Sequence, residues 1–180
     1  LGAIRYQIRF PGEAVEVDAI PYLDSGITNE DTNWDDPFWK TTKIWSEGSR
    51  AFIEAHTLKT RFHTCTFMDT RLALDGKPLE LTPESTEKDT YVGHQYSVAV
   101  PMGKTLTIYK YGGYTVDLNH PEDALSKAAD SVMDTAVNKG FGELLKEQGK
   151  AWKAIWEMSD ITIEGDVRAQ QGIRFNILHL

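Results

Sequence analysis

The sequence predicts a mainly β protein: an antiparallel β-sandwich followed by α-helices. Two observations support this prediction. Before residue 118, short segments alternate apolar with polar residues or are rich in β-branched and aromatic residues, and turn signals separate them, which indicates about eight strands with short links. After residue 118, apolar residues recur instead at the spacing of an amphipathic helix.

Composition sets broad limits on the class of protein. A chain of 180 residues with 41% hydrophobic residues can bury a substantial core. The net charge of −8, from 19 basic and 27 acidic residues, argues against a nucleic-acid partner. No apolar stretch approaches the roughly 20 residues that span a bilayer and no leader opens the chain, so we expect no membrane partner and a cytoplasmic protein. The single cysteine, Cys65, is expected to be a buried core thiol.

The predicted strands cover residues 3–10, 13–20, 42–45, 51–58, 61–68, 72–74, 78–81, 91–100 and 105–111. The first two flank a turn at Pro11-Gly12, so we expect them to pair as an antiparallel hairpin. Asp75-Gly76 predicts a second hairpin with a two-residue turn. The last two predicted strands are expected to pair with each other across the turn at residues 101–104.

The loop at residues 24–36 is rich in oxygen-bearing side chains, which are typical calcium ligands. Aligned on an EF-hand loop, however, it places Trp34 where glycine is needed and Lys40 where a bidentate glutamate is needed. We therefore interpret it as a solvated surface loop and predict no metal site. The aromatic cluster of Trp34, Phe38 and Trp39 would rest on the protein's own sheet, on a neighbouring domain or on a sugar, and these three residues are the candidate carbohydrate contacts.

Two other groups of residues could suggest chemistry but have simpler interpretations. His56, His63 and His94 fall on predicted strands at irregular spacing, unlike any recognised zinc-ligand pattern, so we interpret them as hydrogen-bonded or surface histidines. Gly112-Gly113 lacks the flanking residues of a phosphate loop, and we interpret it as a turn or a bulge.

Three helices are predicted in the last third of the chain. Asn119 is expected to cap the first, which closes at Gly140, and a second begins at Phe141 or Glu143. The apolar face predicted for the first helix consists of Leu125, Ala128, Ala129, Val132, Met133 and Ala136. Residues 161–163 are expected to form a short edge strand. Asp166 then caps a third helix that is apolar on all sides, which predicts burial against a further helical domain and hence a chain that is a piece of a longer protein.

The helical third also carries a family pattern. It consists of Trp152, Trp156-Glu157, Asp160-Ile161, Ile163, Gly165-Asp166 and the run from Gln170 to Asn176, supported upstream by Asn29-Glu30, Asp35 and Phe38-Trp39. With these residues the chain resembles glycoside hydrolase family 65, the disaccharide phosphorylases that act on maltose, trehalose, kojibiose or nigerose. The resemblance covers most of the chain and is greatest to the members that act on maltose.

The resemblance implies an architecture for the longer protein. Its parts are a galactose-mutarotase-like supersandwich, a helical linker, an (α/α)6 barrel and a small C-terminal sheet. Residues 1–118 would belong to the later half of the sandwich, residues 119–165 to the linker, and residues 166–180 to the first barrel helix. This order agrees with the strand-then-helix order read from the residues themselves.

The resemblance also implies a reaction. In the family, inorganic phosphate replaces the water of an inverting hydrolase, so a disaccharide and phosphate would be the partners and no cofactor or metal is needed. A homodimer is expected. The catalytic and phosphate-binding residues of the family lie beyond Leu180, so no catalytic residue is assigned here. Glu157, Glu164 and His179 are interpreted as structural.

Two hypotheses from different classes follow. The first is an inactive piece of a family 65 phosphorylase. The second is a free-standing β-sandwich carbohydrate-binding module that uses the aromatic cluster as a stacking platform.

Overall fold

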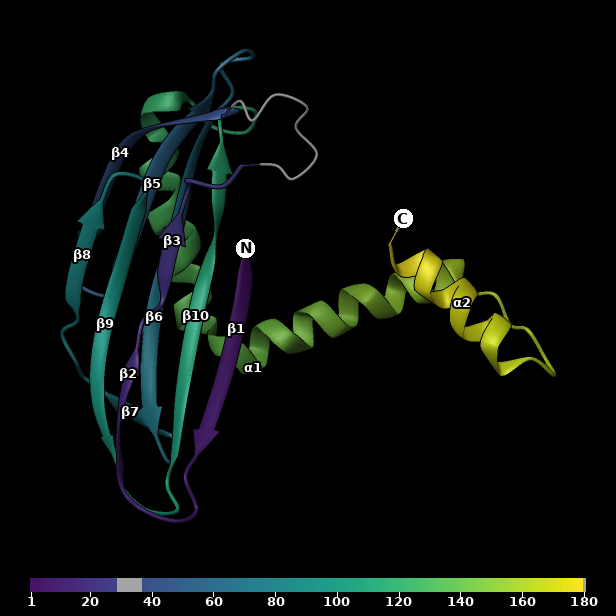
Figure 1. Ribbon diagram of the computed structural model, residues 1–180. Coiled ribbons are helices and arrows are strands. Elements are labelled where there is room, and N and C mark those ends of the chain that lie inside the picture. The colour runs from purple at the N-terminus through teal and green to yellow at the C-terminus, as the bar shows by residue number, and fades with distance from the viewer. Residues whose placement is uncertain (29–36, 180) are drawn as a thin grey trace. The chain divides into compact units, whose positions relative to one another are not determined.

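The computed structural model describes residues 1–28 and 37–179 (Figure 1). They form two compact units, Leu1–Phe141 and Gly142–Leu180, and each is described by itself. The first unit contains all the strands and the start of the long helix, and the second contains the rest of that helix and a shorter one. The predicted domain boundaries at residues 118 and 165 remain predictions.

A six-stranded antiparallel sheet forms one layer of the first unit. Its order is β1-β10-β6-β5-β4, with β7 paired to the end of β6. The bounds are β1 Gly2–Arg9, β4 Trp39–Glu47, β5 Arg50–Thr57, β6 His63–Leu74, β7 Lys77–Leu79 and β10 Thr105–Val116. The central strands β5 and β6 are mostly buried and rich in Thr, Phe and Ala, as expected for strands covered on both faces.

A smaller four-stranded sheet forms the second layer. Its strands are β2 Val15–Ala19, β3 Tyr22–Asp24, β8 Glu84–Lys88 and β9 Tyr91–Val100. All three of the others pair with β9. Because β2 and β3 share one register on β9, with Ala19 opposite Tyr96 and Tyr22 opposite Gly93, they act as one strand interrupted at Pro21, which has no N–H to donate.

Two predicted hairpins are wrong, for the same physical reason. Residues 3–10 and 13–20 do not pair with each other, since β1 pairs with β10 and β2 with β9. Likewise β9 and β10 lie in different sheets. In both cases the turn carries the chain from one layer to the other. An alternating pattern shows which face of a strand is buried, and two strands that face one core from opposite layers have the same pattern as two strands paired in one sheet.

The glycine predictions had mixed outcomes. Asp75 and Gly76 both have positive φ, 49° and 78°, and join β6 to β7, so the predicted two-residue hairpin is confirmed. Gly112 and Gly113, by contrast, lie within β10 and form neither a turn nor a bulge. A Cβ on Gly112 would lie 3.1 Å from the Phe67 carbonyl oxygen, so close packing against the neighbouring strand explains this glycine.

Two apolar layers hold the first unit together. Between the sheets, β2 and β9 pack on β6 and β10 through Val98, Val100 and Leu106, and a second group centres on Ile53 and Met68. On the other face of the large sheet, the helix α1 (Leu125–Ser159) packs on β5 and β6. The side chains in this layer are Phe52, Cys65, Phe67, Leu125, Ala129 and Met133.

The helix α1 departs from regular geometry at Gly140, which has φ 71° and ψ 164°, so the predicted break there is confirmed. All four buried residues of α1 precede it, and they lie on the predicted apolar face. The predicted capping role of Asn119 is wrong. The chain enters α1 through a short 3-10 helix, η1 (Glu122–Ala124), whose N-cap is Pro121 and which has no side-chain cap.

A cluster of charged residues fastens α1 to the sheet. The fully buried Asp69 of β6 accepts hydrogen bonds from Ser49 Oγ at 2.9 Å and from Arg50 Nε at 3.1 Å. The same guanidinium donates to Asp130 at 2.8 Å and to Asp134, both on α1. Burial opposes the charge on Arg50, but these carboxylates outweigh it and raise its pKa above the ordinary value.

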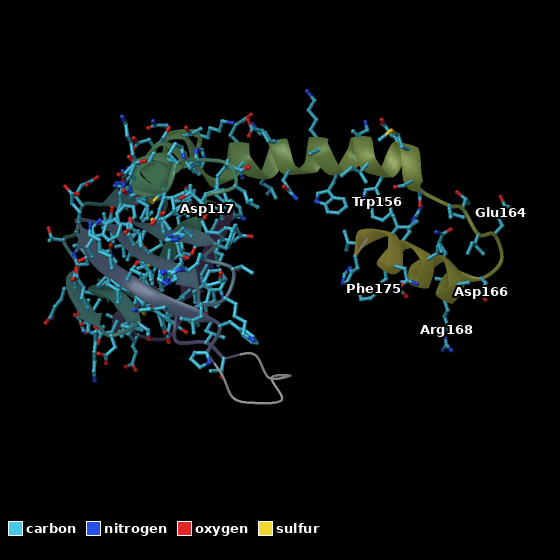
Figure 2. All side chains as sticks on the ribbon, turned by 90° about the horizontal axis from the view of Figure 1, so that it is seen from above. Asp117, Trp156, Glu164, Asp166, Arg168 and Phe175 are labelled. Carbon is cyan, nitrogen blue, oxygen red and sulfur yellow. The ribbon has the colours of Figure 1, made fainter. Side chains whose placement is uncertain are left out.

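The second unit, Gly142–Leu180, consists of the end of α1, a connecting segment and α2, and is called the elbow below. The helix α2 (Val167–Leu178) begins at Asp166, whose side chain accepts hydrogen bonds from the backbone N–H groups of Arg168 and Ala169, so the predicted cap is confirmed (Figure 2). The predicted edge strand at residues 161–163 is wrong. The Gln170 side chain takes the place of a partner strand there: its amide donates to the Ile161 carbonyl at 2.8 Å and accepts from the backbone N–H of residue 163 at 2.6 Å.

Candidate functional site

Two of the three predicted carbohydrate contacts lie at the beginning of β4. Phe38 and Trp39 expose 42% and 39% of their surface, whereas Trp34 lies outside the described residues. The carbonyl of Phe38 accepts a hydrogen bond from Leu58 N–H, so this segment continues the ladder of β4 with β5. Since neighbouring residues of an extended chain project to opposite sides, the two rings do not form one flat platform.

Trp39 borders a cavity of about 440 Å³. The lining residues are Leu23, Asp24, Ser25, Ile27, Trp39, Ile53, Ala55, Phe62, Thr64, Thr66 and Tyr114. The ring of Trp39 is packed edge-on against Phe62, with centroids 6.3 Å apart, which orients the indole. A second cavity of about 330 Å³ shares Ser25, Ile27 and Trp39 with the first in its wall. Sequence reasoning identified the tryptophan but not Phe62 or Tyr114, because strand patterns do not show which residues surround an opening.

The polar groups of this cavity are held in place by the protein itself. Ser25 Oγ and Thr41 Oγ1 lie 2.7 Å apart, and Ser25 also donates to the carbonyl of Thr90. Asp24 Oδ1 accepts from the backbone N–H of Gly26 at 2.7 Å and from Thr90 Oγ1 at 3.1 Å. An oriented aromatic ring beside fixed hydroxyl and carboxylate groups is a lining that suits a sugar, whose ring has apolar faces and a polar rim.

The three histidines serve structural roles, although not all are hydrogen-bonded as predicted. His63 Nδ1 lies 2.8 Å from Glu122 Oε1, and His56 Nε2 lies 3.0 Å from the Arg61 guanidinium. His94 is fully buried, and among the described residues neither of its ring nitrogens meets hydrogen-bond geometry, although the Ser49 backbone lies close enough to act on it. Burial lowers the pKa of His94 and, together with the charge of Arg61, that of His56. Within the described ranges, no group of three or more His, Cys, Asp or Glu side chains is placed to hold a metal ion.

Cys65 is buried as predicted. It lies on β6 under α1 with no exposed surface, and burial raises the pKa of its thiol to about 12. A thiol with so high a pKa is a poor nucleophile at neutral pH, so it belongs to the core and not to a reactive site.

The two carboxylates considered in the helical third have no arrangement that suggests catalysis. Glu157 lies 3.8 Å from Lys153 in an exposed ion pair one turn away, and Glu164 is exposed in the turn before α2 (Figure 2). The ring of His179 packs 4.3 Å from that of Phe175.

Among the described residues, no helix is long and apolar enough to cross a membrane.

The fold and the helical pattern are those of a known family. The model of the glycosyl hydrolase family 65 N-terminal domain matches residues 1–155. The chain belongs to glycoside hydrolase family 65. The maltose phosphorylase of Bacillus subtilis is 30% identical over an alignment of 183 positions that covers 100% of this chain. The α,α-trehalose phosphorylase of Thermoanaerobacter brockii is also 30% identical and covers 96% of it.

This family member spans only part of the length of its relatives. The two alignments cover 23% of the Bacillus and Thermoanaerobacter proteins. A solved structure of a human-microbiome protein, provisionally assigned as a kojibiose phosphorylase, superposes with a TM-score of 0.79 and 21% identity, covering 98% of this chain and 22% of that one. The predicted fold class, an antiparallel β-sandwich followed by linker helices, is confirmed for this family 65 chain.

Proposed function

We propose that this chain is part of a disaccharide phosphorylase that uses inorganic phosphate to cleave an α-glucosidic disaccharide, with maltose as the substrate. The observation that supports this proposal is the alignment of the whole chain with a maltose phosphorylase, across both the sandwich and the helical pattern. The trehalose phosphorylase relative has the same identity, so the choice of maltose rests on the greater coverage of this chain. We further propose that the enzyme works in the cytoplasm as a homodimer.

The reaction proposed is an inverting phosphorolysis. A glutamic acid protonates the glycosidic oxygen while a phosphate oxygen attacks the anomeric carbon from the opposite face, giving β-glucose 1-phosphate and glucose from maltose. The bond from the anomeric carbon to the leaving oxygen breaks as the bond to phosphate forms, so no oxidant, metal or other cofactor is required. We place the catalytic glutamic acid outside residues 1–180, so these residues would support the reaction without performing it.

A direct assay tests the proposal. The 180-residue chain, incubated with maltose and phosphate, is expected to release no glucose 1-phosphate. A protein that joins this chain to a complete family 65 barrel is expected to release it only when phosphate is present. Turnover by the 180-residue chain would contradict the proposed location of the catalytic residue. A longer protein that cleaves trehalose or kojibiose and not maltose would contradict the proposed substrate.

A second candidate function is carbohydrate contact by the sandwich itself. The observation that favours it is the position of Trp39, whose oriented ring borders two adjoining cavities lined by fixed hydroxyl groups. We propose Trp39 as the principal contact, with Phe38 and Trp34 as further contacts. The ligand would be a glucosyl unit of a disaccharide or a longer glucan.

Calorimetric titration of the 180-residue chain with maltose and maltotetraose tests this second function. Saturable binding is expected, and Trp39→Ala should weaken it at least tenfold because the stacking ring is lost. Trp152→Ala is the matched control, since it removes the same side chain from the helical unit. Binding that survives Trp39→Ala, or no binding by the unaltered chain, would contradict the carbohydrate contact without affecting the proposed enzyme activity.

A further inference from the structure

Three polar side chains lie in the interior between the two sheets. Thr70 belongs to β6 of the large sheet, and His94 and Tyr96 belong to β9 of the small sheet. Each exposes 2% of its surface or less. Among the described residues, the Thr70 hydroxyl, both His94 ring nitrogens and the Tyr96 hydroxyl have no partner in hydrogen-bond geometry. Because buried polar atoms are nearly always hydrogen-bonded, this group of atoms points to a ligand that supplies the missing bonds.

The three side chains form a polar layer between two apolar clusters. On β6, Thr70 stands between Met68 and Leu72, whose side chains belong to different clusters. On β9, His94 follows Val92 of the first cluster and precedes members of the second. Alternate residues of a strand share a face, so Thr70 and His94 both point into the space between the sheets, between the same two clusters.

The backbone carbonyl of Ser49 brings Thr70 and His94 to the same place. It accepts a hydrogen bond from the Thr70 N–H at 3.1 Å, and it also lies close to the His94 ring, although outside hydrogen-bond geometry. The Tyr96 ring stands edge-on to the imidazole, with centroids 6.3 Å apart. The polar atoms of the layer therefore surround one position, yet none of them is bonded to another.

The layer is uncharged at neutral pH. Burial lowers the pKa of His94 below its ordinary value and raises the pKa of Tyr96 to about 12, so both rings stay neutral. Asp69, whose charge acts on both rings, is held by two arginines on the other face of β6. Lys110 of β10 donates instead to the carbonyl of Tyr22 at 2.5 Å. The ligand must therefore be small and neutral, and must both donate and accept hydrogen bonds.

We propose that this layer binds one buried water molecule, held by Thr70 Oγ1, the Tyr96 hydroxyl and the His94 ring nitrogen remote from the backbone carbonyl. Three partners are the usual number for an internal water. Threonine is shorter than its two neighbours in the row on β6, so the row recedes at this point between layers that pack about 10 Å apart. The water joins β6 to β9 by hydrogen bonds at the level where the two apolar clusters are interrupted.

A crystal structure of the chain at a resolution that shows ordered waters tests the proposal directly. We expect one water about 2.7–3.2 Å from Thr70 Oγ1, from the Tyr96 hydroxyl and from one His94 ring nitrogen. Three results would overturn the proposal: no water at this position, a water that contacts only one of the two sheets, or polar side chains bonded directly to one another.

A single oxygen atom gives an independent test. Tyr96→Phe removes the hydroxyl and leaves the ring. A hydroxyl bonded to an internal water stabilises the fold, whereas a buried hydroxyl without a partner destabilises it, so the sign of the effect is decisive. The urea midpoint of the variant should fall, and a rise would contradict the bound water. Tyr114→Phe removes an exposed hydroxyl and should leave the midpoint unchanged.

A double-mutant cycle tests whether the two sheets share the water. Thr70→Val replaces the hydroxyl with a methyl group, and its loss of unfolding free energy should not add to that of Tyr96→Phe, because either change disrupts the same water. Thr115→Val is the matched control. Its hydroxyl is also buried but donates to the carbonyl of Leu125 at 2.9 Å, so its effect should add to that of Tyr96→Phe. Additive effects of Thr70→Val and Tyr96→Phe would overturn the shared water, and no outcome bears on the proposed phosphorylase activity.

Discussion

The two halves of α1 have similar helical patterns, but buried residues occur only in the first half. Four residues before Gly140 are buried: Leu125, Ala129 and Met133, which pack on the sheet, and Ala136. After it no residue of α1 is buried, and within the described residues α2 has none either. Apolar residues continue through the second half, where Leu145 is 56% exposed. The difference shows that apolar spacing makes a helix able to pack, while the presence of a surface decides whether it does.

The largest effect is expected from the charged cluster that fastens the first half of α1. Asp69→Ala would leave Arg50 and Arg71 without the buried carboxylate they share, at a cost of about 3–5 kcal/mol in the free energy of unfolding. Urea denaturation of the chain measures this. Asp134→Ala removes an exposed partner of the same arginine and should cost about 1 kcal/mol or less. Equal losses would show that the cluster does not depend on burial.

A matched pair of substitutions compares the two halves of α1 directly. Met133→Ala creates a cavity under the buried half and should lower the unfolding free energy by about 2–5 kcal/mol. Leu145→Ala removes a similar side chain from the exposed half and should change it by less than about 0.5 kcal/mol. A large effect of Leu145→Ala in the same denaturation experiment would mean that the second half has a buried contact after all.

The stability of the two units should also respond differently to acid. The lowered pKa of His94 means that the unfolded chain binds a proton more readily there, so sandwich stability should fall as the pH drops below about 6.5 toward the folded pKa. The Arg174 hydrogen bond lowers the pKa of Asp160, so the elbow should keep its ion pair until the pH falls through that lowered value. Circular dichroism and tryptophan fluorescence against pH would follow both. His94→Gln should reduce the first response, of which the lowered pKa of His56 supplies the remainder, and should leave the second unchanged.

The smallest effect is expected in the elbow. Gln170→Ala removes both hydrogen bonds that hold residues 161–163, and the amide of Ile163 should exchange with solvent about tenfold faster. Gln171→Ala, one residue along α2, is the control and should leave that amide unchanged. The unfolding midpoint of the sandwich should be the same in both variants. A change in that midpoint would show that the elbow supports the sandwich.

Local patterns predicted the faces of elements better than their partners. The apolar face of α1, the cap at Asp166 and the Asp75-Gly76 hairpin follow from neighbouring residues alone, and all three are confirmed. The pairing of β1 with β10 joins residues about a hundred positions apart, and no feature of either strand encodes it. At residues 161–163 the predicted edge strand is wrong, and the side-chain amide of Gln170 supplies hydrogen bonds that a partner strand would have supplied.

At the candidate site, too, the sequence identified a single residue but not the residues that surround it in the fold. Composition and spacing singled out Trp39 as an aromatic residue that must rest on something, and it does border a cavity. The other walls of that cavity come from β3 and the residues that follow it, and from β5, β6 and β10, which come together only when both sheets have formed. Asp69 was also missed, although a carboxylate inside the apolar run of β6 was a readable sign of a buried ion pair.

The buried thiol of Cys65 is a built-in probe of how often α1 separates from the sheet. Because α1 lies directly over Cys65 on β6, a maleimide or a disulfide reagent can reach the sulfur only when the helix lifts from the sheet. The rate of labelling under native conditions would therefore count how often that layer opens, with no probe added and no competing cysteine elsewhere in the chain.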